Sequence, residues 1–255
     1  MSEQMQSVGA LLGDLGGRLV MQTGSCAVHG DADALVLAGR EWACPQCLEL
    51  SMKSSTRALW LAERTASLIP NAMIPARYVD KRFVAETPKQ KIVKQTVASF
   101  RDFILSEKKW AALIMVGVTG TGKTLLACEI AQALVLKASL SARYITAQGM
   151  VSEIQATYGR DGKSEEGEIM RFAQYDVLIL DEIDAVRPKD NTALLLTEII
   201  NRRYNDNKPV IVISNQPFEN LAKFVGDRVF SRLHENAFIC AFEWQDYRRA
   251  AGLAA

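Results

Sequence analysis

The segment Gly117-Val118-Thr119-Gly120-Thr121-Gly122-Lys123-Thr124 matches the pattern G-x-x-x-x-G-K-[ST] at every fixed position. An apolar run at residues 111–116 precedes it, and residues 125–137 follow with helical spacing and no helix breaker. A buried strand, a glycine-rich loop and a helix in this order form a phosphate-binding loop, because backbone N–H groups and the helix N-terminus attract an anion. The segment therefore predicts a nucleotide site on an α/β fold with a parallel sheet.

The polar residues of this loop have distinct expected roles. We expect Lys123 to contact the β- and γ-phosphates of ATP, and the Thr124 hydroxyl to take one coordination position of Mg²⁺. The other loop residues are expected to contact the nucleotide through their backbone, and they are Gly117, Thr119, Gly120, Thr121 and Gly122. ATP and Mg²⁺ are thus the predicted ligands of the loop.

A second apolar run, residues 177–180, ends in the acidic sequence Asp181-Glu182-Ile183-Asp184. The carboxyl end of a central parallel strand faces the crevice in which such sheets bind ligands. We expect Asp181 to hold Mg²⁺, usually through water, and Glu182 to orient or deprotonate the attacking water. Acids favoured by a helix N-terminus are the alternative, and they would account for Asp184.

A third apolar run, residues 210–213, ends in Ser214-Asn215. Its carboxyl end should lie at the same edge of the sheet, which brings the Asn215 amide beside Glu182. There the amide is expected to sense the γ-phosphate.

Four potential metal ligands lie near the N-terminus, in two pairs with a two-residue gap in each: Cys26, His29, Cys44 and Cys47. Four such ligands complete a tetrahedral Zn²⁺ site, so the predicted site is structural. The alternative is a set of free or buried thiols with an incidental histidine. Acidic residues outnumber basic ones around the site, which favours a protein over a phosphate backbone as its partner.

Composition and charge define the expected organisation. The hydrophobic share of 49% and charged share of 23% are typical of a globular protein. No uninterrupted apolar run reaches membrane-spanning length, so we expect a cytoplasmic protein, and its five cysteines make a disulfide framework unexpected.

Residues 71–110 hold nine Lys or Arg against four Asp or Glu. We expect a zinc-binding domain at residues 1–68, including a helix at 48–68, then a basic linker and entry to the core at 69–110, and a nucleotide-binding core at 111–255.

Together these motifs resemble those of the AAA+ ATPases. Within that superfamily, residues 70–250 are similar to the DnaC-type bacterial and phage helicase loaders, whose relatives include the IstB-type transposition ATPases. Besides Asp181–Asp184, the similarity rests on Ile74-Pro75-Ala76-Arg77-Tyr78, on Gly226-Asp227-Arg228-Val229-Phe230-Ser231-Arg232-Leu233, and on Phe242-Glu243-Trp244-Gln245-Asp246-Tyr247-Arg248.

The resemblance implies roles for residues that no local pattern assigns. Arg232 matches the arginine finger that reaches a neighbouring subunit's γ-phosphate, with Arg228 one helical turn earlier as a supporting candidate, and Arg248 resembles the sensor-II arginine. Local salt bridges are the alternative for Arg228 and Arg232. The family's pore-lining insertion corresponds to residues 150–175, where Tyr158, Arg160 and Lys163 are candidate contacts to single-stranded DNA. An exposed, charged helix–loop–helix is the alternative there.

The resemblance further implies an oligomeric ATPase that loads a hexameric DnaB-type replicative helicase onto single-stranded DNA, with residues 1–68 docking the helicase. Two alternatives stay open. One is an IstB-like transposition ATPase, which acts with duplex DNA and a transposase. The other is a nucleotide-gated adaptor with negligible turnover.

Overall fold

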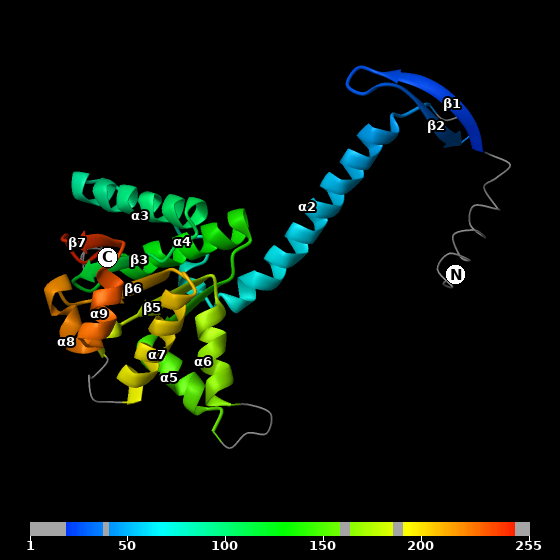
Figure 1. The fold of residues 1–255 in the computed structure, drawn as a ribbon. Helices are drawn as coiled ribbons and strands as arrows, with labels where there is room; N and C mark the ends of the chain where they lie inside the picture. The colour runs from blue at the N-terminus through cyan, green and yellow to red at the C-terminus, as the bar shows by residue number, and fades with distance from the viewer. Residues whose placement is uncertain (1–18, 38–40, 159–163, 186–190, 248–255) are drawn as a thin grey trace. The chain divides into compact units, whose positions relative to one another are not determined.

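The computed structural model describes residues 19–37, 41–158, 164–185 and 191–247. The chain forms two compact units, residues 1–63 and 64–255, and each is described separately (Figure 1). The division falls inside the long helix α2 (Pro45–Asn71), a few residues before the domain boundary expected at residue 68. Pro70 does not end the helix early, although proline disfavours helix at the preceding residue, because it lies in the last turn. Among the helices of the described residues, none is long and apolar enough to cross a membrane.

The first unit contains an antiparallel hairpin and the start of α2. Strands β1 (Leu19–Cys26) and β2 (Gly30–Leu37) pair so that Cys26 lies opposite Gly30, across a three-residue connection. The Trp42 indole packs against Gly24, where any Cβ would collide with the ring. Pro45 begins α2, at a position where the missing N–H of proline costs nothing.

The second unit is built on a five-stranded parallel sheet in the order β4-β5-β6-β3-β7. The strands are β3 (Ala112–Gly117), β4 (Ala142–Thr146), β5 (Val177–Asp181), β6 (Val210–Ser214) and β7 (Ala237–Phe242). The apolar runs predicted as strands at 111–116, 177–180 and 210–213 correspond to β3, β5 and β6, with ends that differ by one residue.

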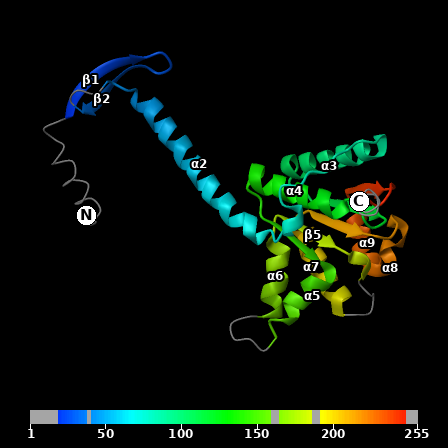
Figure 2. The same ribbon diagram turned by 180° about the vertical axis from the view of Figure 1, so that it is seen from behind.

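Helices cover both faces of this sheet (Figure 1 and Figure 2). On one face lie α3 (Pro88–Ser106) and α4 (Lys123–Ala138), whose apolar residues meet one alternate set of strand side chains. The other face is covered by α5 (Ala147–Gln155), α6 (Glu165–Gln174), α7 (Asn191–Asn205), α8 (Leu221–Val225) and α9 (Asp227–His234). Short 3₁₀ turns occur at η1 (Ala76–Tyr78), η2 (Ile183–Ala185) and η3 (Phe218–Asn220). The expected α/β fold with a parallel sheet between helices is confirmed.

The segment expected as a basic linker, residues 69–110, differs from that expectation. It carries α3, which begins at a capping box formed by Thr87 and Gln90 and packs on β7. The buried side of α3 repeats with helical spacing, and its residues are Val93, Val97, Phe100 and Ile104. Lys89, Lys91 and Lys94 lie on the exposed side of the same helix, so the basic charge conceals an apolar face that belongs to the core.

Candidate functional site

The phosphate-binding loop joins the end of β3 to the start of α4, as the sequence predicts. Gly120 has φ +79°, and a Cβ there would collide with the Asp246 carboxylate, so both conformation and space require glycine. Lys123 is buried, and its Nζ donates to the carbonyl oxygens of Gly117 and Val118, the latter at 2.8 Å. These two carbonyls thus hold the Lys123 ammonium group against the phosphate-binding loop.

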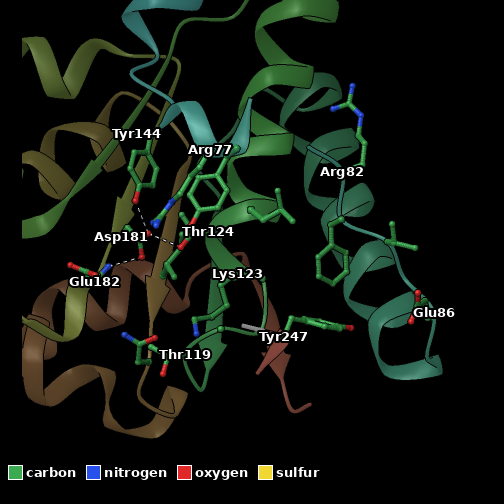
Figure 3. Close-up of a pocket in the computed structure, with 18 residues that line it drawn as sticks. Arg77, Arg82, Glu86, Thr119, Lys123, Thr124, Tyr144, Asp181, Glu182 and Tyr247 are labelled. Atoms are coloured by element: carbon green, nitrogen blue, oxygen red, sulfur yellow. Dashed lines mark hydrogen bonds between the residues drawn. The ribbon is translucent and has the colours of Figure 1, made fainter. Parts of the chain in front are cut away.

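Asp181, at the end of β5, accepts hydrogen bonds from three other residues of the site (Figure 3). Its Oδ2 accepts hydrogen bonds from the Thr124 hydroxyl and from the Tyr144 hydroxyl, each at 2.8 Å, while Oδ1 accepts from the Glu182 N–H at 2.8 Å. Burial and the negative charge of Asp181 raise the pKa of Tyr144, which keeps its hydroxyl protonated and donating. Thr124 and Asp181, predicted from separate motifs to share Mg²⁺, are therefore in direct contact, and a hydroxyl beside a carboxylate is a donor set that suits this cation.

Glu182 and Asn215 lie at the same edge of the sheet as Asp181, and both line the cavity that contains Lys123. The Glu182 side chain is exposed, and its backbone has φ +54°, a left-handed conformation that costs a non-glycine residue free energy. The Asn215 N–H donates to Asp184 Oδ1 at 2.9 Å, which links the ends of β5 and β6. The two strand-end motifs thus meet as the parallel-sheet argument predicts.

The cavity has a volume of about 560 Å³, large enough for a nucleotide. Besides the phosphate loop and the strand ends, the cavity is lined by residues that the sequence motifs did not assign to the site: Arg77, Tyr78, Arg82, Phe83, Val84, Glu86 and Tyr247. Arg82 and Glu86 lie across the cavity from Asp181, whereas Arg77 lies beside Asp181 (Figure 3). Arg77 and Tyr78 belong to the segment 74–78, which marked the family resemblance, so that segment was a signal whose role in the site was missed.

The segment after β7 crosses the phosphate loop. The Trp244 indole N–H donates to the Thr121 carbonyl at 3.0 Å, and the Tyr247 N–H donates to the Gly120 carbonyl at 3.1 Å. Gln90, at the start of α3, donates to the Tyr247 hydroxyl. Segments far apart in the sequence therefore fix the conformation of the loop. Arg248, the expected sensor-II residue, lies outside the described residues.

Arg228 and Arg232 both lie on α9 and do not line this cavity. The Arg232 guanidinium donates to the Asn201 side chain and lies 5.2 Å from the centre of the Tyr204 ring. Neither arginine forms an ion pair with another described residue. Within the described part of the chain, the alternative of local salt bridges therefore finds no support.

The candidate DNA-contacting residues lie in the sequence between α5 and α6. Tyr158 is exposed, and its hydroxyl donates to Glu165. Arg160 and Lys163 lie outside the described residues.

The four predicted zinc ligands come together in the first unit. Their ligand atoms all lie within 4.8 Å of one another. The Sγ atoms of Cys26 and Cys47 are 3.7 Å apart, and His29 Nδ1 lies 3.5 Å from Cys44 Sγ and 3.3 Å from Cys47 Sγ. Zn–S and Zn–N bond lengths imply tetrahedral edges of about 3.5–3.8 Å, so the cluster fits Zn²⁺. The turn between β1 and β2 supplies one pair and the start of α2 supplies the other.

Comparison with known protein families identifies the chain. A family model described as "IstB-like ATP binding protein" matches residues 51–239, about three quarters of the sequence. The chain belongs to this family. The replicative helicase loader DnaC of Escherichia coli K12 is 30% identical over 139 residues, which cover 54% of this chain and 56% of that protein. The chain therefore spans about half the length of the curated relatives it matches.

Solved structures share the fold of the second unit. The crystal structure of the DnaC helicase loader aligns with a TM-score of 0.58 and 22% identity, over 66% of this chain and 99% of that one. The replication initiator DnaA, solved with AMPPCP and single-stranded DNA, aligns with a TM-score of 0.57 and 19% identity, over 68% of this chain and 52% of that one. The second unit thus has the same fold as these two proteins.

Proposed function

We propose that this protein is an ATP-dependent helicase loader, which places a hexameric DnaB-type replicative helicase on single-stranded DNA and hydrolyses ATP with Mg²⁺. The main support is the convergence of the phosphate loop with Asp181, Glu182 and Asn215 on one cavity of nucleotide size. The helicase as partner is supported by the relative named a replicative helicase loader.

Each residue of the cavity has a task in this proposal. Lys123, now bonded to loop carbonyls, binds the β- and γ-phosphates of ATP when these replace the carbonyls as acceptors. Thr124 and Asp181 hold Mg²⁺, which when bound neutralises part of the phosphate charge. Glu182, exposed in the cavity, orients the attacking water, and Asn215 contacts the γ-phosphate from the neighbouring strand.

Hydrolysis in this proposal requires assembly. Arg232 does not line the cavity of its own chain, so it acts on the nucleotide of a neighbouring subunit, with Arg228 beside it. Asn201 and Tyr204 hold the Arg232 guanidinium without a carboxylate, which leaves its positive charge available to a phosphate.

The first unit docks the helicase. A zinc ion held by the Cys/His cluster stabilises the hairpin against the start of α2, because so small a module buries little apolar surface. On α2 within this unit, Leu48, Met52 and Trp60 expose an apolar stripe with helical spacing, which suits a protein partner. Tyr158 and the segment that follows it contact the single-stranded DNA.

The decisive experiment uses purified helicase from the same host and circular single-stranded DNA coated with single-strand-binding protein. We expect the full chain to capture the helicase and to transfer it to the coated circle in the presence of ATP, which is measured as helicase retained on the DNA. Cys44→Ser should lose capture, whereas Lys123→Ala should keep capture and lose ATP binding. If the full chain instead binds duplex DNA and captures no helicase, the IstB-like transposition ATPase is the favoured alternative. Full loading by Glu182→Gln would favour the adaptor with negligible turnover.

A further inference from the structure

Tyr144 is a residue of the cavity that no motif predicted, and its hydroxyl contacts the carboxylate expected to hold Mg²⁺. It lies in the middle of β4, opposite Ile179 of β5, and its side chain reaches along the sheet to Asp181 (Figure 3). The hydroxyl lies 2.8 Å from Asp181 Oδ2, the same oxygen that accepts from Thr124. Tyr144 therefore lines the cavity and also contacts Asp181.

The backbone of Tyr144 is held on both sides. On one side β4 pairs with β5, and on the outer side the Tyr144 N–H donates to the Ala72 carbonyl at 2.9 Å. Ala72 itself is buried. An edge strand fixed in this way has little freedom to shift, so the phenol presents its hydroxyl from a rigid element, which is what positioning a ligand carboxylate requires.

The hydrogen bonds of Asp181 then determine which oxygen remains accessible. An ionised carboxylate has about four acceptor positions. Among the described residues, Thr124 and Tyr144 occupy the two on Oδ2, and the Glu182 N–H occupies one on Oδ1. The remaining position belongs to Oδ1. Without the Tyr144 hydroxyl the carboxylate would have a second open position and greater freedom to rotate.

From this geometry we propose that Tyr144 is a positioning residue of the ATP site, which orients the Asp181 carboxylate so that one oxygen is directed to Mg²⁺. The proposal rests on the function proposed above and adds a residue that sets the Mg²⁺ requirement of the site. Phosphate contacts come from the loop, so Tyr144 has no direct part in binding the nucleotide itself.

The test is Tyr144→Phe, which keeps the ring and removes the hydroxyl. The matched control is Ser141→Ala at the opposite end of the same strand pair. There the Ser141 hydroxyl donates to Asp176 Oδ2, also at 2.8 Å, but outside the cavity. Both variants remove one hydroxyl-to-carboxylate hydrogen bond between the β4 and β5 segments, and Ser141→Ala also removes the acceptor of the Asp176 N–H. Only Tyr144→Phe acts at the carboxylate expected to hold Mg²⁺.

Binding of a fluorescent ATP analogue is measured in EDTA and then in a Mg²⁺ titration. We expect Tyr144→Phe to bind like wild type in EDTA and to need about ten-fold more Mg²⁺ for half-maximal effect, the scale of one hydrogen bond to a charged group. Ser141→Ala should follow wild type in both conditions.

Two results overturn the proposal. One is a wild-type Mg²⁺ requirement in Tyr144→Phe. The other is an equal loss of nucleotide affinity by Tyr144→Phe in EDTA and in Mg²⁺, because such a loss indicates a structural role for the hydroxyl. A thermal melt of the same sample then shows whether the variant has unfolded. A wild-type protein that binds no nucleotide in either condition would refute the proposed function together with this inference.

Discussion

Arg203 of α7 is the largest side chain that the described structure buries completely, and it provides a sharp test of how the second unit is held together. Its guanidinium donates at 2.5–3.4 Å to five backbone carbonyls, those of Phe172, Ala173, Tyr175, Asp176 and Pro209. Burial lowers the pKa of Arg203 to about 9, so the side chain is still a cation at pH 7. The first two carbonyls belong to the last turn of α6, where helix carbonyls have no intrahelical partner.

We predict that Arg203→Met destabilises the protein strongly. The methionine fills much of the space but removes the donor that these carbonyls share, and each buried acceptor left unsatisfied costs about 1–3 kcal/mol, so we expect a total loss of about 3–5 kcal/mol. For a unit of this size, each kcal/mol lowers the melting temperature by about 2–4 °C, so we expect a decrease of about 10 °C. Arg203→Lys should be intermediate, because an ammonium keeps the charge with fewer donors.

The neighbouring Arg202 is the matched control. It forms ion pairs with Glu166 and Glu198, both at 2.7 Å, but its side chain is 27% exposed and both glutamates face solvent. Ion pairs at such positions contribute about 0–1 kcal/mol, so Arg202→Met should change little. Urea unfolding at pH 7 measures both variants. Equal losses for the two, or a loss below about 1 kcal/mol for Arg203→Met, would refute the reasoning.

Three further outcomes follow from the candidate sites. Protein purified without chelator should contain about one zinc per chain, and a preparation with none would contradict the fit of the Cys/His cluster. Lys123→Ala should abolish ATP binding, since the loop loses its phosphate-facing charge, and an unchanged affinity would argue against this nucleotide site. Arg232→Ala should keep ATP binding and lose about 10³-fold in hydrolysis. A mixture of Arg232→Ala and Glu182→Gln should regain part of that activity, because some subunit interfaces then combine an intact site with an intact arginine. If the two variants assemble but no activity returns, Arg232 acts within its own chain.

Patterns local in the sequence predicted the centre of the second unit well. The segment 117–124 specified strand, loop and helix, because its glycines and its flanking periodicities act within a few residues. The apolar run before Asp181 indicated a parallel strand, and parallel topology alone requires that Asp181 and Asn215 emerge at one edge. The Cys/His spacing predicted the cluster of the first unit for a similar reason, since each pair is held by its own short turn.

Other features depend on contacts between segments far apart in the chain. Residues 69–110 were expected to link domains because their lysines dominate the composition, whereas α3 packs on β7, more than 130 residues later. Tyr144 belongs to no motif, and Tyr247 belongs to a segment that marked the family resemblance but had no assigned role in the site. Both reach the cavity because the order of the sheet and the path after β7 bring them there.

The sequence by itself determined the class of the fold, the phosphate loop, the acidic end of β5 and the Cys/His cluster, since short-range geometry controls each of them. Only the tertiary structure decided which hydroxyl donates to the Asp181 carboxylate, which carbonyls accept hydrogen bonds from Arg203, and which part of the cavity wall residues 77–86 form. The physical reason is that most of these hydrogen bonds join residues separated by 27 or more positions, and periodicity within one segment carries no information about such partners.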